Sequence, residues 1–224
     1  VEIKASEAAA PMAAAMQKDF PQVEQTVRLR SRGSAPVRPV GEDANAKETD
    51  VAFADASFIE FFGVGIISGD AKTALAEPYT LVLTQTAATK HFGEESALGK
   101  RLLLNNTDTF TVSGVIEDLP KNSFLRDYSI FMAMEGHPAS KEDNWGSNNF
   151  YTFIKLIPDA NIEEFQKPLL GMLEDYMLPW AQEFFPGMTA ETFAASGNYI
   201  RYHTIPLRDI HLYSQRDQEM SANG

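Results

Sequence analysis

Residues 79–123 read YTLVLTQTAATKHFGEESALGKRLLLNNTDTFTVSGVIEDLPKNS, and this stretch decides the fold. It opens with an apolar run at residues 81–83, which predicts a buried strand. Thr84 can cap a helix over residues 85–92, because its hydroxyl accepts a hydrogen bond from a free backbone N–H of the first turn. Gly93 follows, where a left-handed residue commonly ends a helix. Two side chains of this helix are expected to face the core, Ala88 and Phe92.

The second half of the stretch predicts a hairpin. Leu102 and Leu104 share one face of a strand, residues 105–108 are turn formers, and residues 110–115 resume an extended pattern. Pro120 closes the unit, since a proline cannot continue the hydrogen-bond ladder of a central strand. The order is strand, helix, hairpin and exit turn, without a recognisable reaction motif.

The beginning of the chain predicts a β-α-β unit. Residues 1–4 alternate as in a strand, residues 8–20 carry a helical pattern that Pro21 stops, and residues 23–29 give a second strand. The apolar stripe of the helix consists of Met12, Met16 and Phe20.

Three shorter segments connect this unit to the central stretch. Residues 31–49 are rich in glycine, proline and charge, which is typical of a loop or a loose hairpin. Residues 50–54 predict a strand, and residues 55–63 predict one or two helical turns ending at Gly63. The apolar side chains of these turns are expected in the core: Phe58, Ile59 and Phe62.

The region after the central stretch starts with strands at residues 128–134 and 150–157, separated by a polar loop at residues 136–149. Trp145, in that loop, suits equally an exposed recognition aromatic and a lid over the core.

A helix capped by Asn161 follows, and Pro168 should kink it or mark its true start. Its apolar stripe is Ile162, Phe165, Leu169, Leu173, Tyr176 and Trp180. Residues 179–198 are expected to be irregular and residues 199–205 to form a last strand, which completes a second β-α-β unit.

Composition excludes several functions. The 224 residues carry a formal net charge of −12, with a pI near 4.8, which argues against nucleic acid and against tight docking on an anionic lipid surface. The chain has no cysteine, which removes disulfides, thiolate catalysis and cysteine metal sites. No apolar run approaches the ~18 residues of a membrane span. Because the sequence also lacks an initiator methionine, we expect it to be a fragment of a larger protein.

Candidate chemistry is sparse. His91, His137, His203 and His211 are scattered without a zinc-ligand spacing, and a convergence of His203, Asp209 and His211 is less favoured than exposed positions. Ser96 and Lys100 lack the spacing of a serine–lysine pair, and no nucleophile-elbow, P-loop or dinucleotide motif occurs. Four acidic pairs lack a calcium-loop pattern and are expected on a solvated surface: Glu42-Asp43, Glu94-Glu95, Glu163-Glu164 and Glu174-Asp175. We therefore predict no catalytic, cofactor-binding or metal-binding residue.

The order of several short motifs resembles one family. The segments FPQVE, FFGV with a following GD, LTQTAATKHFG, GVIEDLPKNS and LRDIHLYS occur in that order over nearly the whole chain. Together they resemble the periplasmic core domain of MacB/FtsX-type ABC transporter permeases, particularly FtsX-like permeases of Bacteroidetes. The resemblance implies an α+β fold with a porter-like β-α-β part formed from both chain ends, at residues 1–62 and 136–224. A central β-rich, Sabre-like insertion with a small helix would occupy residues 63–135.

The resemblance also implies the function. Such a domain lies in the periplasm between the first and second transmembrane helices of an inner-membrane permease, with both chain ends on the membrane side. It is not an enzyme and binds no cofactor, since ATP is bound by a separate cytoplasmic ATPase. It would couple ATP hydrolysis to substrate or partner handling (mechanotransmission). The implied partners are the flanking transmembrane helices, the ABC ATPase subunit, a second permease protomer and a periplasmic or outer-membrane protein, but no nucleic acid.

An alternative function stays open at this point. A stand-alone periplasmic binding module for a small molecule or peptide would require an enclosed apolar pocket with convergent polar groups. Chain ends that lie together, without such a pocket, would favour the transporter domain.

Overall fold

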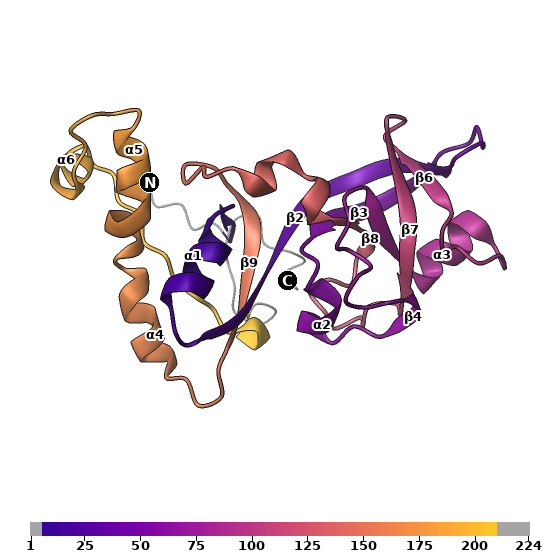
Figure 1. Cartoon of the computed structure of the whole chain (residues 1–224), viewed down its shortest axis with the longest axis horizontal. Coiled ribbons are helices and arrows are strands. Elements are labelled where there is room, and N and C mark those ends of the chain that lie inside the picture. Colours follow the sequence, from indigo (N-terminus) through magenta and orange to yellow (C-terminus); the bar gives the residue numbers. More distant parts are fainter. Residues whose placement is uncertain (1–5, 210–224) are drawn as a thin grey trace.

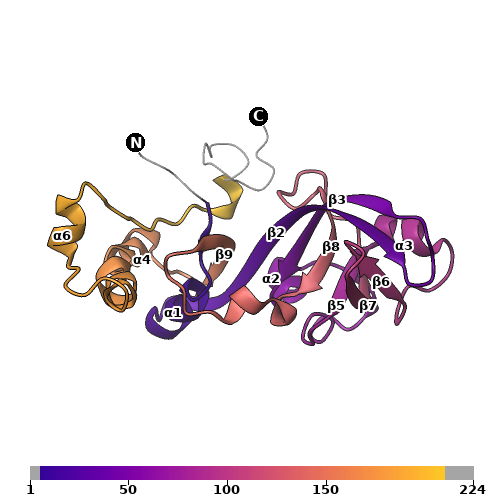
Figure 2. The ribbon, with the colours of Figure 1, turned by 90° about the horizontal axis from the view of Figure 1, so that it is seen from above.

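The computed structural model describes residues 6–209, which form two lobes joined by the long strand β2 (Figure 1). We call residues 29–133 the barrel lobe, and residues 6–28 with 134–209 the helical lobe. Figure 2, turned by 90°, places α6 and α3 at opposite ends of the molecule. The elements are β1 (Ala8–Ala9), α1 (Met12–Asp19), β2 (Val23–Pro39), β3 (Ala46–Ala54), α2 (Phe58–Phe62), β4 (Ile66–Gly69), β5 (Thr80–Thr84), α3 (Gln85–Phe92), β6 (Arg101–Leu104), β7 (Asp108–Ile116), β8 (Tyr128–Ala133), η1 (Met134–Gly136), η2 (Pro138–Lys141), β9 (Asn148–Leu156), α4 (Ile162–Leu169), the π-helical η3 (Leu173–Met177), α5 (Leu178–Gln182) and α6 (Ala190–Ala195).

Six strands of the barrel lobe pair in a closed circuit, β2–β3–β8–β5–β7–β6 and back to β2. The pairings β3–β8 and β5–β7 are parallel, and the other four are antiparallel. β4 extends the sheet from β7, while β9 and then β1 extend it from β2 into the helical lobe. A closed circuit leaves few free strand edges, which favours a rigid body.

The strands of the barrel lobe alternate between two apolar cores. In β5, Leu81 and Leu83 belong to one core, whereas Val82 belongs to the other. In β8, Met132 and Phe131 divide in the same way. This alternation follows from the two-residue period of a strand and shows that both faces of the circuit are packed.

The central stretch confirms most of its prediction. The Thr84 hydroxyl accepts a hydrogen bond from the backbone N–H of Ala87 at 3.3 Å, and α3 ends at Gly93 with φ +60°. Asn105 and Asn106 have φ of 51° and 60° in the three-residue connection 105–107 between β6 and β7, and asparagine tolerates this left-handed conformation. The inner face of α3 differs by one position, because its buried residues are Ala87 and His91, whereas Ala88 and Phe92 are only partly buried.

Of the two alternatives predicted for residues 31–49, the hairpin is confirmed and the loop is wrong, because most of the segment is paired strand. β2 continues to Pro39, and β3 already begins at Ala46. The register between the two strands shifts on both sides of Gly33, whose φ of +71° suits glycine. These bulges place glycine and charged residues within a continuous hairpin, which composition alone cannot distinguish from a loop. The strand at residues 50–54 and the helical turn α2 are confirmed.

The helical lobe packs α1 and α4 together over the sheet. Met12, Met16 and Phe20 are buried as predicted, and the ring of Phe20 lies 5.7 Å from that of Phe165 in α4. Ala8 and Ala9, assigned to the first helix by the sequence, instead pair with β9 as the short strand β1. The strand predicted at residues 1–4 lies outside the described residues.

The region after β9 is more helical than predicted. The Asn161 side chain caps α4 by accepting hydrogen bonds from the backbone N–H groups of Glu163 and Glu164. The helix α4 ends at Leu169, directly after Pro168. After a short break the chain forms η3 and then α5, which follow α4 in one column (Figure 1). The irregular segment predicted at residues 179–198 is therefore wrong, since it contains most of α5 and all of α6.

The strand predicted at residues 199–205, and with it the second β-α-β unit, is wrong. This segment contains neither helix nor strand, and a helical turn starts at Leu207. On the edge of β9 away from β2, β1 pairs only at Asn148 and Phe150. Residues 203–205 lie against β9 as part of the wall of a pocket instead of extending the ladder.

Trp145 lies over the core of the helical lobe, 4% exposed, with its ring stacked on Tyr176 at 4.8 Å. None of the described helices is long and apolar enough to cross a membrane. The domain boundaries at residues 62/63 and 135/136 stay a prediction. The α+β class is confirmed, with a mixed sheet flanked by separate helices.

Candidate functional site

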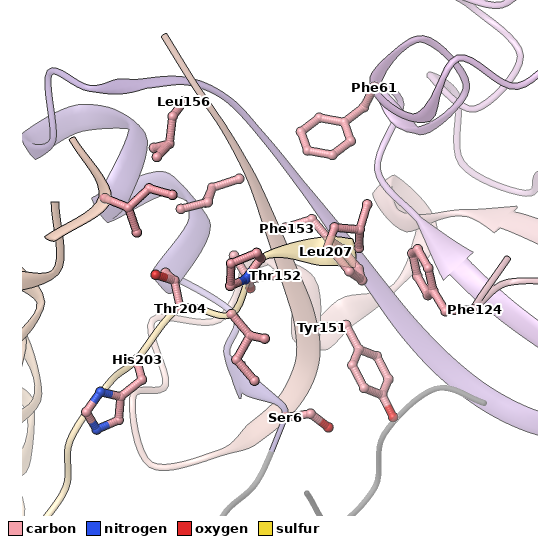
Figure 3. A pocket seen from close by; sticks show the side chains of 14 residues that line it. Ser6, Phe61, Phe124, Tyr151, Thr152, Phe153, Leu156, His203, Thr204 and Leu207 are labelled. Carbon is pink, nitrogen blue, oxygen red and sulfur yellow. The ribbon is translucent and has the colours of Figure 1, made fainter. Parts of the chain in front are cut away.

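A pocket of about 250 Å³ lies over β9, between the two lobes (Figure 3). β9 supplies its floor with the consecutive side chains of residues 151–154 and Leu156. Phe61 from the end of α2 and Phe124 from the loop before β8 line its barrel side. Residues 203–207 form the opposite wall, together with Ser6.

The barrel side of the pocket consists of packed aromatic rings. The ring of Phe153 lies 5.3 Å from the rings of both Phe62 and Phe124. Phe61 in turn contacts Phe62 at 4.9 Å with a near-perpendicular orientation. Such edge-to-face pairs fix the rings relative to one another, so this wall is preformed.

The wall formed by residues 203–207 is held differently. Within the described part of the chain, residues 199–205 make no backbone hydrogen bond to any other backbone group. Among the described residues, this segment is therefore held mainly by side-chain packing and by one hydrogen bond from the backbone N–H of Asp209 to the Pro206 carbonyl, which is easier to displace than a strand in a ladder.

The pocket is uncharged in a strongly acidic chain. Among residues 6–209, those that line it include no aspartate, glutamate, lysine or arginine. The Thr152 hydroxyl, on the floor, is buried and has no hydrogen-bond partner among residues 6–209. This arrangement favours contact with apolar groups and offers few polar positions.

A second constellation centres on Glu48 in β3, which is 3% exposed. One carboxylate oxygen lies 2.8 Å from Nε2 of His91 and 2.8 Å from Nζ of Lys90, both on α3. The other accepts a hydrogen bond from the Ser129 hydroxyl of β8 at 2.6 Å. Burial raises the pKa of Glu48, but the three hydrogen bonds outweigh burial and lower the pKa to about 2. The network anchors α3 to the strands β3 and β8.

These residue types also occur in hydrolase triads, but the order in space is different. A triad places histidine between the nucleophile and the carboxylate, so that the ring can accept the hydroxyl proton. Here the carboxylate of Glu48 lies between Ser129 and His91. The hydroxyl therefore donates to a carboxylate that the network keeps ionised, and the arrangement serves packing.

The other histidines do not converge. His137 stacks edge-on against Phe53 at 4.6 Å, and burial, with Arg30 and Arg32 nearby, lowers its pKa. His203 is exposed at the rim of the pocket, and His211 lies outside the described residues, so a His203–Asp209–His211 site is not described.

The remaining candidates of the sequence lie apart on the surface. All eight residues of the four acidic pairs are exposed, and Lys100 pairs with Glu95 rather than with Ser96. Among residues 6–209, no three histidine, aspartate or glutamate side chains are grouped to hold a metal ion.

A partly buried ion pair connects the lobes. Arg28 of β2 contacts both carboxylate oxygens of Asp55, through Nη2 at 2.9 Å and Nε at 3.1 Å. Its Nη1 donates to the carbonyl of Ala10, before α1, and to that of Ser140, in η2. The guanidinium also lies 5.6 Å from the ring centre of Phe150. One side chain thus joins segments of both lobes, and nothing in the local sequence indicated this role.

The pocket was missed because its walls come from six separate segments: Ser6, Phe61, Phe124, β9, Ile162 and residues 203–207. Only the aromatic run at residues 58–62 marks it in the sequence, and that run suits a core equally well. The Glu48 network was missed because its members lie far apart in the sequence.

Comparison with known proteins places this geometry in a family. The profile of the MacB-like periplasmic core domain matches residues 3–170. A domain assigned to a permease of Porphyromonas gingivalis has a similar structure, with a TM-score of 0.68 and 27% identity over 76% of this chain and 78% of that chain. Among curated proteins, none matches the chain.

Two more distant structures share the fold. The periplasmic region of MacB from Actinobacillus actinomycetemcomitans gives a TM-score of 0.57 and 14% identity over 82% of this chain and 86% of that chain. The extracellular domain of the noncanonic ABC-type transporter YknZ from Gram-positive bacteria gives 0.55 and 16%, over 76% of this chain and 84% of that chain.

Proposed function

The chain belongs to the MacB-like periplasmic core domain family, and we propose that it transmits ATP-driven movement from the membrane to partners or substrates in the periplasm. Domains of this family are parts of ABC transporter permeases and are generally not catalytic themselves. The proposal concerns what this domain does within such a permease, namely the transmission of movement.

One observation carries the proposal: the two ends of the described chain lie together. Ser6 and residues 203–207 line the same pocket over β9. Ser6 to Ala8 and residues 201–204 also line a second hollow against α1 and α4. A domain hung from two neighbouring transmembrane helices needs such an arrangement. Displacement of those helices would then act first on the helical lobe.

The structure supports a path from there to the barrel lobe. β2 is 17 residues long, and it pairs with β9 in the helical lobe and with β3 and β6 in the barrel. The Arg28–Asp55 pair lies where these pairings meet. In this proposal the ATP is bound by the cytoplasmic ATPase, and this domain holds no cofactor.

The test uses the intact permease assembled with its ATPase. Since the chain has no cysteine, spin labels at Arg208→Cys and Glu95→Cys report the separation of the end segment and the far lobe. Both side chains are mostly exposed, 86% and 77%. We expect the distance distribution to differ between nucleotide-free and ATP–vanadate states. An unchanged distribution in a complex that hydrolyses ATP would contradict the proposal.

A pair of variants tests the path. Arg28→Lys removes the two-pronged contact with Asp55, because a lysine cannot bridge both carboxylate oxygens. It should reduce the nucleotide-dependent distance change by at least about half, with ATP hydrolysis retained. Glu24→Gln is the matched control, since it breaks the exposed pair between Glu24 of β2 and Lys155 of β9. If both variants behave alike, the Arg28–Asp55 pair is not part of the path.

A further inference from the structure

We propose that the pocket over β9 binds an uncharged, hydrophobic ligand about the size of two aromatic rings. This inference is independent of the proposed function, because it requires neither a membrane nor an ATPase. It names a ligand class for a pocket that lies between the two lobes (Figure 3).

The volume of the pocket limits the size of the ligand. The cavity volume is about 250 Å³. An apolar cavity of roughly 150 Å³ is enough to take up benzene. The pocket therefore has room for a second ring or for an alkyl chain of similar volume. It is half open, so a ligand can enter without unfolding of the domain.

The residues that line the pocket limit the polarity and charge of the ligand. Phe61, Phe124 and Phe153 offer ring faces and edges, while Leu156, Ile162 and Leu207 add aliphatic surface. A carboxylate or ammonium group inside would lose its hydration without gaining an opposite charge, which is strongly unfavourable. Among the described residues, the polar side chains at the surface of the pocket are few, with Thr204 in the wall and His203 at the rim.

Three other hollows of the described chain are lined by charged residues, so the lack of charge is particular to the pocket over β9. The hollow beside Trp145 is lined by Lys18, Asp143, Asp175 and Glu183. The hollow at the lobe junction contains Arg28 and Asp55, and the one against α1 contains Glu7 and Arg201. In a chain of net charge −12, the pocket over β9 differs from these because the described residues that line it include no acidic residue, lysine or arginine.

Binding would also fix the position of residues 203–207. One side of the ligand would contact the rings that α2, β9 and Phe124 hold in place, and the other would contact this weakly held segment. The ligand would thus bridge a preformed wall and a displaceable one. Amide hydrogen exchange in residues 203–207 is therefore expected to slow when the ligand is bound.

Two fluorescent probes with a shared scaffold test the ligand class. 1-Naphthylamine is a neutral two-ring probe at pH 7, and 8-aminonaphthalene-1-sulfonate is the same scaffold with a sulfonate. We expect the 224-residue chain to bind the neutral probe saturably at one site and the sulfonate at least about tenfold more weakly. No saturable binding of the neutral probe, or equal affinity for both, would overturn the proposal.

Substitutions in the pocket test whether the neutral probe binds there. Thr204→Trp and Leu207→Trp each fill the pocket from the displaceable wall, and both are made because one of them could disturb folding. Each should weaken the neutral probe at least about tenfold. Ile67→Trp is the matched control, because Ile67 of β4 is 49% exposed and does not line the pocket. Wild-type affinity in both pocket variants, each checked for a native circular dichroism spectrum, would place the probe elsewhere and overturn the proposal.

Discussion

The barrel lobe and the helical lobe are built from similar residues but are stabilised differently. Of the largest fully buried side chains, all but Phe150 and Phe165 lie in the barrel lobe. Large exposed apolar side chains gather instead in the helical lobe, including Phe184 and Phe185, which are 61% and 62% exposed. The barrel strands form a closed circuit with packed cores on both faces, whereas α4, η3 and α5 form a broken column over one side of the sheet.

This difference indicates a division of roles. A closed, doubly packed sheet resists deformation, because any movement would open hydrogen bonds and cavities together. The helical lobe, held by one core and by side-chain contacts, can change its arrangement at lower cost. We therefore expect the lobe that carries both described ends to move and the barrel lobe to stay rigid.

The largest expected effect comes from removing one buried aromatic ring from the core of each lobe and comparing the results. Phe131→Ala removes a ring that is fully buried in the barrel and lies 4.3 Å from Phe58. It should cost about 3–5 kcal/mol of unfolding free energy and lower the stability of the whole chain.

Phe165→Ala is the matched change in the helical lobe, at a residue that is equally buried. It should release α4 locally and leave amide exchange in the barrel unchanged. Hydrogen exchange followed by mass spectrometry distinguishes the two outcomes. Global destabilisation by Phe165→Ala would show that the lobes are not separable.

A smaller effect tests how α3 is anchored to the barrel. The Glu48 pKa of about 2, against an ordinary value of 4.5, corresponds to about 3 kcal/mol of stability at neutral pH. Glu48→Gln should lose about 2 kcal/mol of it at pH 7, measured by chemical denaturation.

The pH dependence of this effect has a definite sign. Because the folded pKa is lowered, the stabilisation is present above pH 4.5 and is lost as the pH falls towards 2. Wild type and Glu48→Gln should therefore converge in stability across that range. Glu95→Gln is the control, since the carboxylate of Glu95 is paired with Lys100 but exposed. If the difference in unfolding free energy between wild type and Glu48→Gln stayed constant down to pH 2, the ionised Glu48 would not be the source of the stabilisation.

The smallest expected effect concerns the cap of α4. Asn161→Ala removes the two hydrogen bonds to the backbone N–H groups of Glu163 and Glu164 and should cost about 1 kcal/mol. The loss should show as faster exchange in residues 162–169 rather than in the barrel. Faster exchange of the barrel amides would mean that α4 stabilises both lobes.

The sequence predicted the barrel lobe better because its signals are local. Thr84, Gly93 and the Asn105–Asn106 turn determine their own conformations, and the alternation of Leu81 to Leu83 follows from the strand period. Pairing order is not local. The parallel pairings of β3 with β8 and of β5 with β7 join segments that no motif connects.

The helical lobe was harder to predict for a related reason. Residues 199–205 have strand propensity, but they form no ladder with β9, although β1 occupies the edge of β9 only at Asn148 and Phe150. The same limit applies within the barrel lobe, where the burial of Glu48 and His91 depends on a contact 43 residues apart in the sequence. The candidate pocket depends on the same kind of distant contact, between Ser6, β9 and residues 203–207.

Hydrogen exchange on the intact permease and its ATPase tests the central claim most directly. The account predicts that ATP with vanadate changes exchange in α1, α4 and residues 199–207, while the strands β3, β5, β7 and β8 keep their exchange rates. Changes centred on the barrel strands, or no change in either lobe during ATP turnover, would contradict it.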